Sequence, residues 1–173
     1  MDELHENEQY FFDAPTLDRL ARFLAGLERP CCLCAPLLGQ HLARRGADVR
    51  ILDIDERFAG TPGFRRYDVY RPEWLSERYG LILCDPPFFK VSLSQLFAAI
   101  RVLSHHAFDQ PLMIGYLQRR ASALLGTFAP FALRPTGFSP TYLTITETER
   151  TAVEFFANVS DERLAPLLTP ADQ

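Results

Sequence analysis

Residues 81–90 of the chain read LILCDPPFFK. Four apolar residues run into an acid, and two prolines and two phenylalanines follow. A continuous apolar run is typical of a strand that is covered on both faces. Two prolines hold the next residues at a φ of about −65° and remove two N–H donors. The stretch therefore predicts a buried strand that ends in a rigid segment, which presents the Asp85 carboxylate and backbone carbonyl oxygens without competing donors.

Such a segment suits an amine on a flat ring. A planar –NH2 group donates two hydrogens, which the Asp85 carboxylate and a carbonyl can accept, while the ring stacks on Phe88 as flipped bases stack on aromatic side chains. Holding both hydrogens localises the lone pair on the nitrogen, so that it can attack a methyl group in line. The alternative from these residues alone is an ordinary turn with Phe88 in the core.

The rest of the chain alternates between strand and helix patterns. We expect strands at 31–35, 49–55, 64–70, 81–84 and 111–117, and helices at 16–27, 36–46, 92–106 and 118–128. TYLTI (141–145) and AVEFFANV (152–159) predict a hairpin joined by TETERT (146–151). This order predicts an α/β fold with a mostly parallel sheet and an antiparallel edge. We expect residues 1–9 to be a flexible arm, 10–165 a single domain and 166–173 a tail.

In an open parallel sheet, ligands bind beyond the carboxyl ends of the strands. This places Ala35, Asp53, Asp68 and Asp85 on one rim. Asp53 follows the second strand, where an acid commonly bonds the ribose hydroxyls of a nucleotide-like cofactor, although it is also an ordinary turn residue there. Asp55 is the weaker candidate, because it can instead pair with Arg57.

The turn after the first strand contains no GxGxxG pattern, and Pro36 offers no N–H group to a pyrophosphate. This disfavours NAD and FAD, and no P-loop pattern occurs in the sequence. S-adenosylmethionine carries no phosphate, so a turn of this kind remains compatible with it.

Composition gives broader bounds. The chain has 173 residues, 47% of them apolar, and a net charge of −4, which argues mildly against a dedicated high-affinity nucleic-acid binder but not against an enzyme that visits nucleic acid. The cysteines indicate a reducing compartment and lack zinc-site spacing; they are Cys31, Cys32, Cys34 and Cys84. The acidic N-terminus is unlike a targeting signal, and we expect a soluble, cytoplasmic protein with no metal and no membrane contact.

Five segments occur in a recognisable order and spacing: QYFFD (9–13), CLCAP (32–36), ILDIDERF (51–58), FRRYDVYRP (64–72) and LILCDPPF (81–88). Together they resemble the probable N6-adenine methyltransferase family, whose eukaryotic members include a lysine methyltransferase that acts on a translation elongation factor. The resemblance covers roughly residues 9 to 145.

The resemblance implies a Rossmann-like fold with a seven-stranded, mostly parallel sheet, a C-terminal antiparallel hairpin and S-adenosylmethionine as cofactor. It implies a catalytic tetrapeptide formed by Asp85, Pro86, Pro87 and Phe88. For cofactor binding it implies a turn at Ala35 and Pro36, the ribose acid Asp53, Asp68 near the cofactor adenine, and an aromatic segment of Tyr10, Phe11 and Phe12 over the methionine end.

Two departures from the family pattern concern the acceptor. Residues 138–145 read FSPTYLTI where the family usually has Asn-Glu-Phe, and Phe89 and Lys90 replace the usual acidic residues after the tetrapeptide. Arginines at 65, 66, 71, 119 and 120 form either a local basic rim or ordinary solvated surface.

We therefore predict methyl transfer to an exocyclic amine, adenine N6 of DNA or RNA. One alternative acceptor is a protein lysine, and another reading is a non-catalytic binding module with the same fold. A partner subunit or a homo-oligomer would supply the target recognition that so short a chain lacks.

Overall fold

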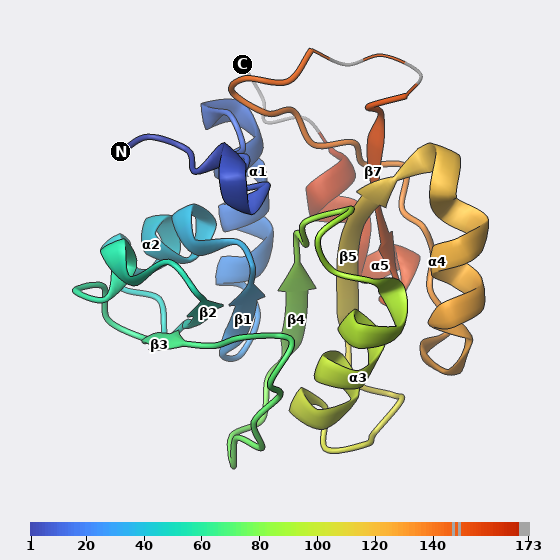
Figure 1. The fold of residues 1–173 in the computed structure, drawn as a ribbon, viewed down its shortest axis with the longest axis horizontal. Helices are drawn as coiled ribbons and strands as arrows, with labels where there is room; N and C mark the ends of the chain where they lie inside the picture. The colour runs from blue at the N-terminus through green and yellow to red at the C-terminus, as the bar shows by residue number, and fades with distance from the viewer. Residues whose placement is uncertain (147, 149, 170–173) are drawn as a thin grey trace.

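The structure is a computed structural model and describes residues 1–146, 148 and 150–169. A seven-stranded sheet runs through its centre (Figure 1). In spatial order the strands are β3 (Phe64–Arg66), β2 (Arg50–Asp53), β1 (Pro30–Leu33), β4 (Leu81–Cys84), β5 (Leu112–Leu117), β7 (Val153–Ala157) and β6 (Arg134–Pro135). β1 to β5 are parallel, and β7 runs antiparallel to both of its neighbours. The predicted α/β class and mostly parallel sheet are confirmed.

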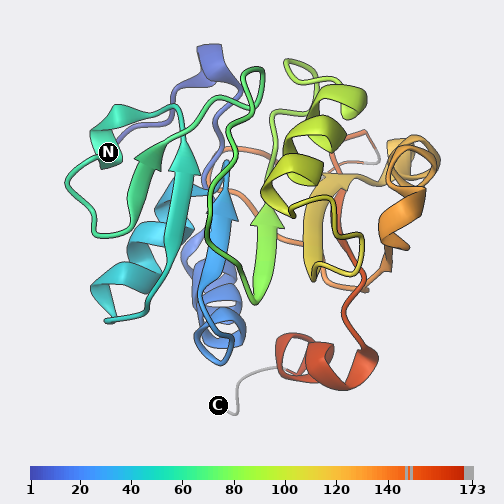
Figure 2. The same ribbon diagram turned by 90° about the horizontal axis from the view of Figure 1, so that it is seen from below.

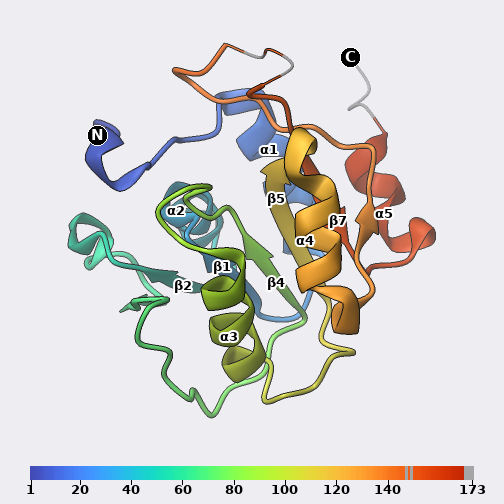
Figure 3. The same cartoon turned by 45° about the vertical axis from the view of Figure 1, so that its right-hand side comes forward.

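Helices cover both faces of the sheet, as Figure 2 shows. On one face lie α1 (Ala14–Ala25), α2 (Pro36–Arg44) and α5 (Asp161–Leu168), and on the other α3 (Leu93–Leu103) and α4 (Ala121–Thr127) (Figure 3). Short 3-10 turns occur at His5–Asn7, Glu56–Phe58, Gln118–Arg120 and Ala129–Phe131. Because both faces are covered, every residue of β1, β4 and β5 is buried, which explains their continuous apolar sequences.

Local sequence signals fix where several elements begin and how they pack. The Asp13 carboxylate caps α1 by accepting from the N–H of Thr16 at 3.0 Å. Pro36 opens α2, where its missing N–H costs no hydrogen bond. α2 lies so close to β2 that a Cβ atom on Gly39 would stand 2.5 Å from Cγ1 of Ile51.

The predicted hairpin strand at 141–145 is wrong. The residues paired with β7 are those of β6, and the contact continues as the N–H of Thr136 donates to the carbonyl of Phe155 and the N–H of Phe155 to that of Phe138. These contacts occupy Phe155, Phe156 and Ala157 on this side of β7. Residues 141–145 turn instead toward the N-terminal segment, where Tyr142 forms an isolated bridge with Phe12. Of the predicted connection 146–151, residues 147 and 149 lie outside the described part.

The predicted division into an arm, one domain and a tail stays a prediction. The boundary at 165 falls inside α5, whose Leu164 and Leu167 are buried in the same cluster as α1, while residues 170–173 of the predicted tail lie outside the described range. Residues 1–9 include one 3-10 turn, and their flexibility stays a prediction. Within the described residues, no helix has the length and apolar character needed to cross a membrane.

Candidate active site

The loops that follow β1, β2, β3 and β4 meet at one edge of the sheet and line a cavity of about 170 Å³. The strand order reverses its direction between β1 and β4, which is where open α/β sheets bind ligands. All eleven residues predicted for the site line this cavity: Tyr10, Phe11, Phe12, Ala35, Pro36, Asp53, Asp68, Asp85, Pro86, Pro87 and Phe88. The fold therefore brings together the residues predicted from the sequence, and their individual roles stay predictions.

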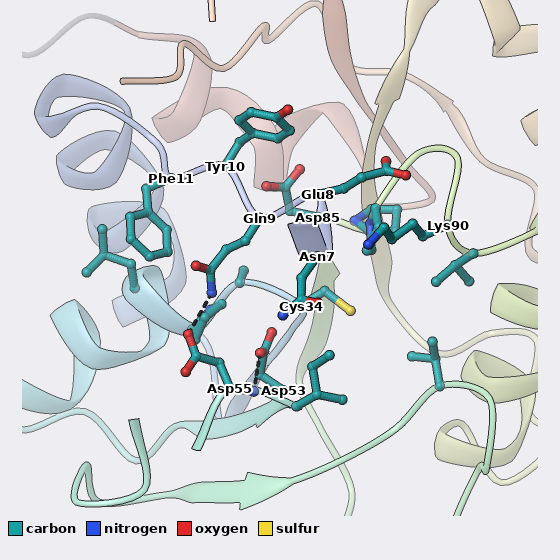
Figure 4. Close-up of a pocket in the computed structure, with 18 of the residues that line it drawn as sticks. Asn7, Glu8, Gln9, Tyr10, Phe11, Cys34, Asp53, Asp55, Asp85 and Lys90 are labelled. Atoms are coloured by element: carbon teal, nitrogen blue, oxygen red, sulfur yellow. Dashed lines mark hydrogen bonds between the residues drawn. The ribbon is translucent and has the colours of Figure 1, made fainter. Parts of the chain in front are cut away.

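Asp85 projects into the cavity from the end of β4 (Figure 4). Its backbone N–H donates to the carbonyl of Leu33 at 3.2 Å, and its Oδ1 accepts from the hydroxyl of Tyr142 at 2.9 Å. Burial of the carboxyl group raises its pKa to about 8, and the hydrogen bond from Tyr142 opposes that rise. Gly115 of β5 makes room for the group, because a Cβ there would lie 3.3 Å from Oδ1.

The segment after Asp85 keeps acceptor groups free. Among the described residues, no donor bonds the carbonyl oxygen of Pro86. The carbonyl of Phe88, in contrast, accepts from Nη1 of Arg120 at 3.0 Å. The Phe88 ring is half-buried and stands edge-on to Tyr116, with 5.6 Å between ring centroids, so it borders both the core and the cavity. A Phe88 ring that stacks on a ligand and a Phe88 ring that packs in the core are therefore compatible interpretations.

A second acidic group lies at the C-terminal end of β2, whose last residue is Asp53. Oδ1 of Asp53 accepts from the N–H of Asp55 at 2.8 Å, and burial raises the pKa of Asp53 to about 6, assisted by the negative charge of Asp55 and opposed by that N–H group. Asp55 pairs with Arg57 at 2.8 Å, which lowers its pKa. This pairing was the anticipated alternative for Asp55, and it leaves Asp53 as the acid available to a ligand.

The turn between β1 and α2 has an unusual backbone. Cys34 adopts a left-handed conformation with φ of 58°, which costs a residue with a side chain roughly 1–2 kcal/mol. Its N–H donates to the carbonyl of Leu52 at 2.9 Å, which ties the turn to β2. Ala35 is buried, and Pro36 opens the helix without an N–H group. The site thus lacks the cradle of N–H groups that a phosphate needs.

Asp68 lies on the third loop of the rim. Its Oδ1 accepts from the N–H of Tyr70 at 2.9 Å, which closes a local turn. Tyr67 is buried beside it, and its hydroxyl accepts from the N–H of Glu73 at 3.2 Å. One Asp68 oxygen is thus used by the fold, and the carboxylate still borders the cavity.

The aromatic segment before α1 plays two structural parts. Phe11 packs edge-on against Phe58, and Phe12 packs against Tyr142 with 5.3 Å between centroids, so both rings are buried although both residues border the cavity. Tyr10 is the partly exposed member of the three. Phe12 therefore supports Tyr142, which in turn contacts Asp85.

Several residues that line the cavity were missed: Asn7, Glu8, Gln9, Cys34, Lys90 and Tyr142. The segment predicted as an arm closes one side, because Nε2 of Gln9 donates to Asp55 at 2.8 Å and Glu8 accepts from the N–H of Phe89 at 3.1 Å. The one available signal for Tyr142 was its place in FSPTYLTI, the stretch that departs from the family pattern. Among the described residues, no cluster of His, Cys, Asp and Glu resembles a metal site.

The sequence matches a known protein family. A family model described as probable N6-adenine methyltransferase matches residues 3–160. No curated protein matches the chain.

Solved structures share its fold. Magnesium protoporphyrin IX methyltransferase from Synechocystis PCC 6803 with bound S-adenosylmethionine is 18% identical, with a TM-score of 0.57 over 82% of this chain and 76% of that one. A TehB-like S-adenosylmethionine-dependent methyltransferase from Corynebacterium glutamicum is 17% identical, with a TM-score of 0.52 over 83% and 88%. An N-methyltransferase from Bradyrhizobium japonicum is 15% identical, with a TM-score of 0.51 over 86% and 99%. At these identities the likeness concerns the fold alone.

Proposed function

The chain belongs to the probable N6-adenine methyltransferase family, and from this premise we propose that its methyl acceptor is the N6 amine of an adenine in DNA or RNA. The family and the fold make the chain an S-adenosylmethionine-dependent methyltransferase. The observation that supports the acceptor is the group of Asp85, Pro86 and Phe88 in one cavity with Asp53. That group offers two oxygen acceptors and an aromatic ring to a planar amine.

The proposed cofactor residues come from four segments: the stretch before α1 and the ends of β1, β2 and β3. Asp53 is the acid for the ribose hydroxyls, since Asp55 is bound to Arg57. Ala35, Pro36, Asp68 and the segment of Tyr10, Phe11 and Phe12 complete the proposed cofactor site. When bound, S-adenosylmethionine supplies a methyl group on a positively charged sulfur.

The acceptor residues position the amine. Oδ1 of Asp85 is taken by Tyr142, so Oδ2 accepts one amine hydrogen and the Pro86 carbonyl accepts the other. Asp85 and the Pro86 carbonyl would hold the amine nitrogen toward the methyl group that S-adenosylmethionine would supply, and Asp85 or water would take the one proton that the methylated amine releases. Most of the rate gain comes from holding the nitrogen in line and from the nearby negative charge.

The state of Asp85 sets a condition on the reaction. A pKa of about 8 means that much of the carboxyl group is protonated at neutral pH. The ionised form is the better acceptor for an amine hydrogen and the better recipient of the released proton. We therefore expect transfer to accelerate as the pH rises toward and past 8.

Labelling of cell lysate tests the acceptor class. Purified protein and tritiated S-adenosylmethionine are added to lysate, and the product is divided between nuclease and protease treatment. We expect the label to be lost with nuclease and to appear in N6-methyladenine after digestion to bases. Label that survives nuclease and is lost with protease would contradict the adenine proposal. Asp85→Ala is the matched control: it should abolish labelling and leave calorimetric affinity for S-adenosylmethionine nearly unchanged.

Protein lysine is the second candidate acceptor, and one observation favours it. Glu8 and Asp85 both line the cavity, and two acids there would attract a cationic amine, which must lose its proton before attack. The protease arm of the labelling experiment detects this outcome. Family membership speaks against a non-catalytic module, and calorimetry with S-adenosylmethionine, repeated on Asp53→Ala, tests that alternative. A partner subunit or homo-oligomer stays a prediction.

A further inference from the structure

Phe89 is a large apolar side chain on the surface beside the proposed acceptor site. Its neighbours in sequence, Phe88 and Lys90, both line the cavity, whereas Phe89 itself is 64% exposed. The backbone of Phe89 is held in place by a hydrogen bond, in which its N–H donates to the Glu8 carboxylate at 3.1 Å. Two consecutive rings therefore stand at the cavity, one bordering its interior and one outside it.

Two guanidinium groups accompany the exposed ring. Cζ of Arg119 lies 5.8 Å from the Phe89 ring centroid and Cζ of Arg120 lies 5.6 Å from it. Both are anchored by backbone carbonyls, Arg120 by that of Phe88 at 3.0 Å and Arg119 by that of Arg150 at 3.1 Å. With Lys90 they place positive charge around an aromatic surface on a chain whose net charge is −4.

We propose that Phe89 stacks on the nucleotide next to the target adenine in a single-stranded nucleic acid, while Arg119, Arg120 and Lys90 meet its phosphates. This inference rests on the proposed function. An adenine that enters the cavity must leave the stack of its neighbours. An exposed aromatic ring beside the entrance replaces the stacking that the neighbouring base loses, and aromatic rings between basic side chains are how proteins commonly hold single strands. One acid, Glu8, bonds the N–H of Phe89, but the two guanidinium groups beside the ring and Lys90 outnumber it, and this excess favours a polyanion over a basic peptide.

Phe89→Ala tests the platform directly. The probe is a short fluorescent single-stranded RNA, or the DNA of the same sequence, that contains one adenine. We expect the variant to bind it about 5- to 150-fold more weakly than the wild type by anisotropy. Methyl transfer to this strand should lose more than transfer to free adenosine does, because adenosine has no neighbouring base.

Trp74→Ala is the matched control. Trp74 is 57% exposed, but it stacks on His105 and does not line the cavity. Its removal should leave binding and transfer unchanged. Arg119→Gln tests the charged part, and we expect the slope of log affinity against log salt to fall by about 0.7, the share of one phosphate contact on a single strand.

The outcomes separate this inference from the function beneath it. Should the wild type methylate the strand while Phe89→Ala matches it within twofold in binding and transfer, the platform is wrong and the proposed function stands. If the wild type methylates neither strand nor adenosine but labels protein, the proposed function fails and the inference with it. An equal loss on the strand and on adenosine would also overturn the platform, because it would show damage to the acceptor site itself.

Discussion

Replacing Tyr142 with phenylalanine should raise the pKa of Asp85. The Tyr142 hydroxyl donates a hydrogen bond to Oδ1 of Asp85 at 2.9 Å, and this bond opposes the effect of burial on the pKa of Asp85. Phenylalanine keeps the ring that packs on Phe12 and removes the oxygen alone. The substitution therefore changes the electrostatics of the carboxylate while largely preserving its packing.

The size of the effect follows from the bond. A hydrogen bond to a charged group contributes about 1.5–3 kcal/mol, and one pKa unit corresponds to about 1.4 kcal/mol. A rise of about one to two units follows, with the lower end expected because Tyr142 keeps some contact with solvent. From a wild-type pKa of about 8, the ionised fraction at neutral pH then falls roughly tenfold or more.

The assay is the pH dependence of kcat/KM, which reports ionisations of the free enzyme. Activity should rise with pH in both proteins, because ionised Asp85 accepts the amine hydrogen, and the rise should come at higher pH in Tyr142→Phe. Carbon-13 NMR of labelled aspartate gives the same pKa without any acceptor. Tyr79→Phe is the control, since it removes a tyrosine hydroxyl that donates to Glu77, and Tyr79 does not line the cavity. An unchanged profile and an unchanged carboxyl titration in Tyr142→Phe would refute the reasoning.

Three further changes test other parts of the molecule. The melting temperature of Asp85→Asn should rise relative to that of the wild type between about pH 4 and pH 8, because folded Asp85 keeps a proton in this range that the unfolded chain releases. A difference in melting temperature that does not change with pH would contradict this. Affinity for S-adenosylmethionine should fall as the pH drops through about 6 and Asp53 becomes protonated, and Asp53→Ala should lose about 10- to 100-fold by calorimetry above that pH, whereas no loss would exclude the ribose role. Gly39→Ala should cost about 1–3 kcal/mol in urea denaturation, because its Cβ would lie 2.5 Å from Ile51, and an unchanged midpoint would show that α2 moves away freely.

The rim of the sheet could be predicted from sequence because its determinants are local. Two apolar runs that become central strands carry a predicted site residue at their C-terminal end: Asp53 is the last residue of β2, and Asp85 directly follows β4. Parallel pairing then brings those strand ends to one edge, whatever the details of the loops. The positions of Asp53 and Asp85 at this edge could therefore be predicted without knowing any contact between distant segments.

The missed features depend on contacts between distant segments. β6 has two residues, Arg134 and Pro135, and carries no strand pattern of its own. Tyr142 reaches Asp85 only because residues 141–145 turn toward the N-terminal segment. α5 contains Pro166, which removes an N–H donor and weakens its helical pattern, so that its beginning at Asp161 was not recognised.

The bonds of Glu8 and Gln9 have a kinetic consequence. Gln9 is tied to Asp55 in the loop after β2, and Glu8 to Phe89 in the loop after β4, so two consecutive residues fasten together the two loops that carry the proposed cofactor and acceptor groups. We expect a spent cofactor to leave past Glu8 and Gln9 once these two hydrogen bonds open. We expect the opening of these hydrogen bonds to limit turnover, as loop opening does in many enzymes whose loops close over the reactants. Residues 8 and 9 would then govern how long each cofactor stays and how often the enzyme works.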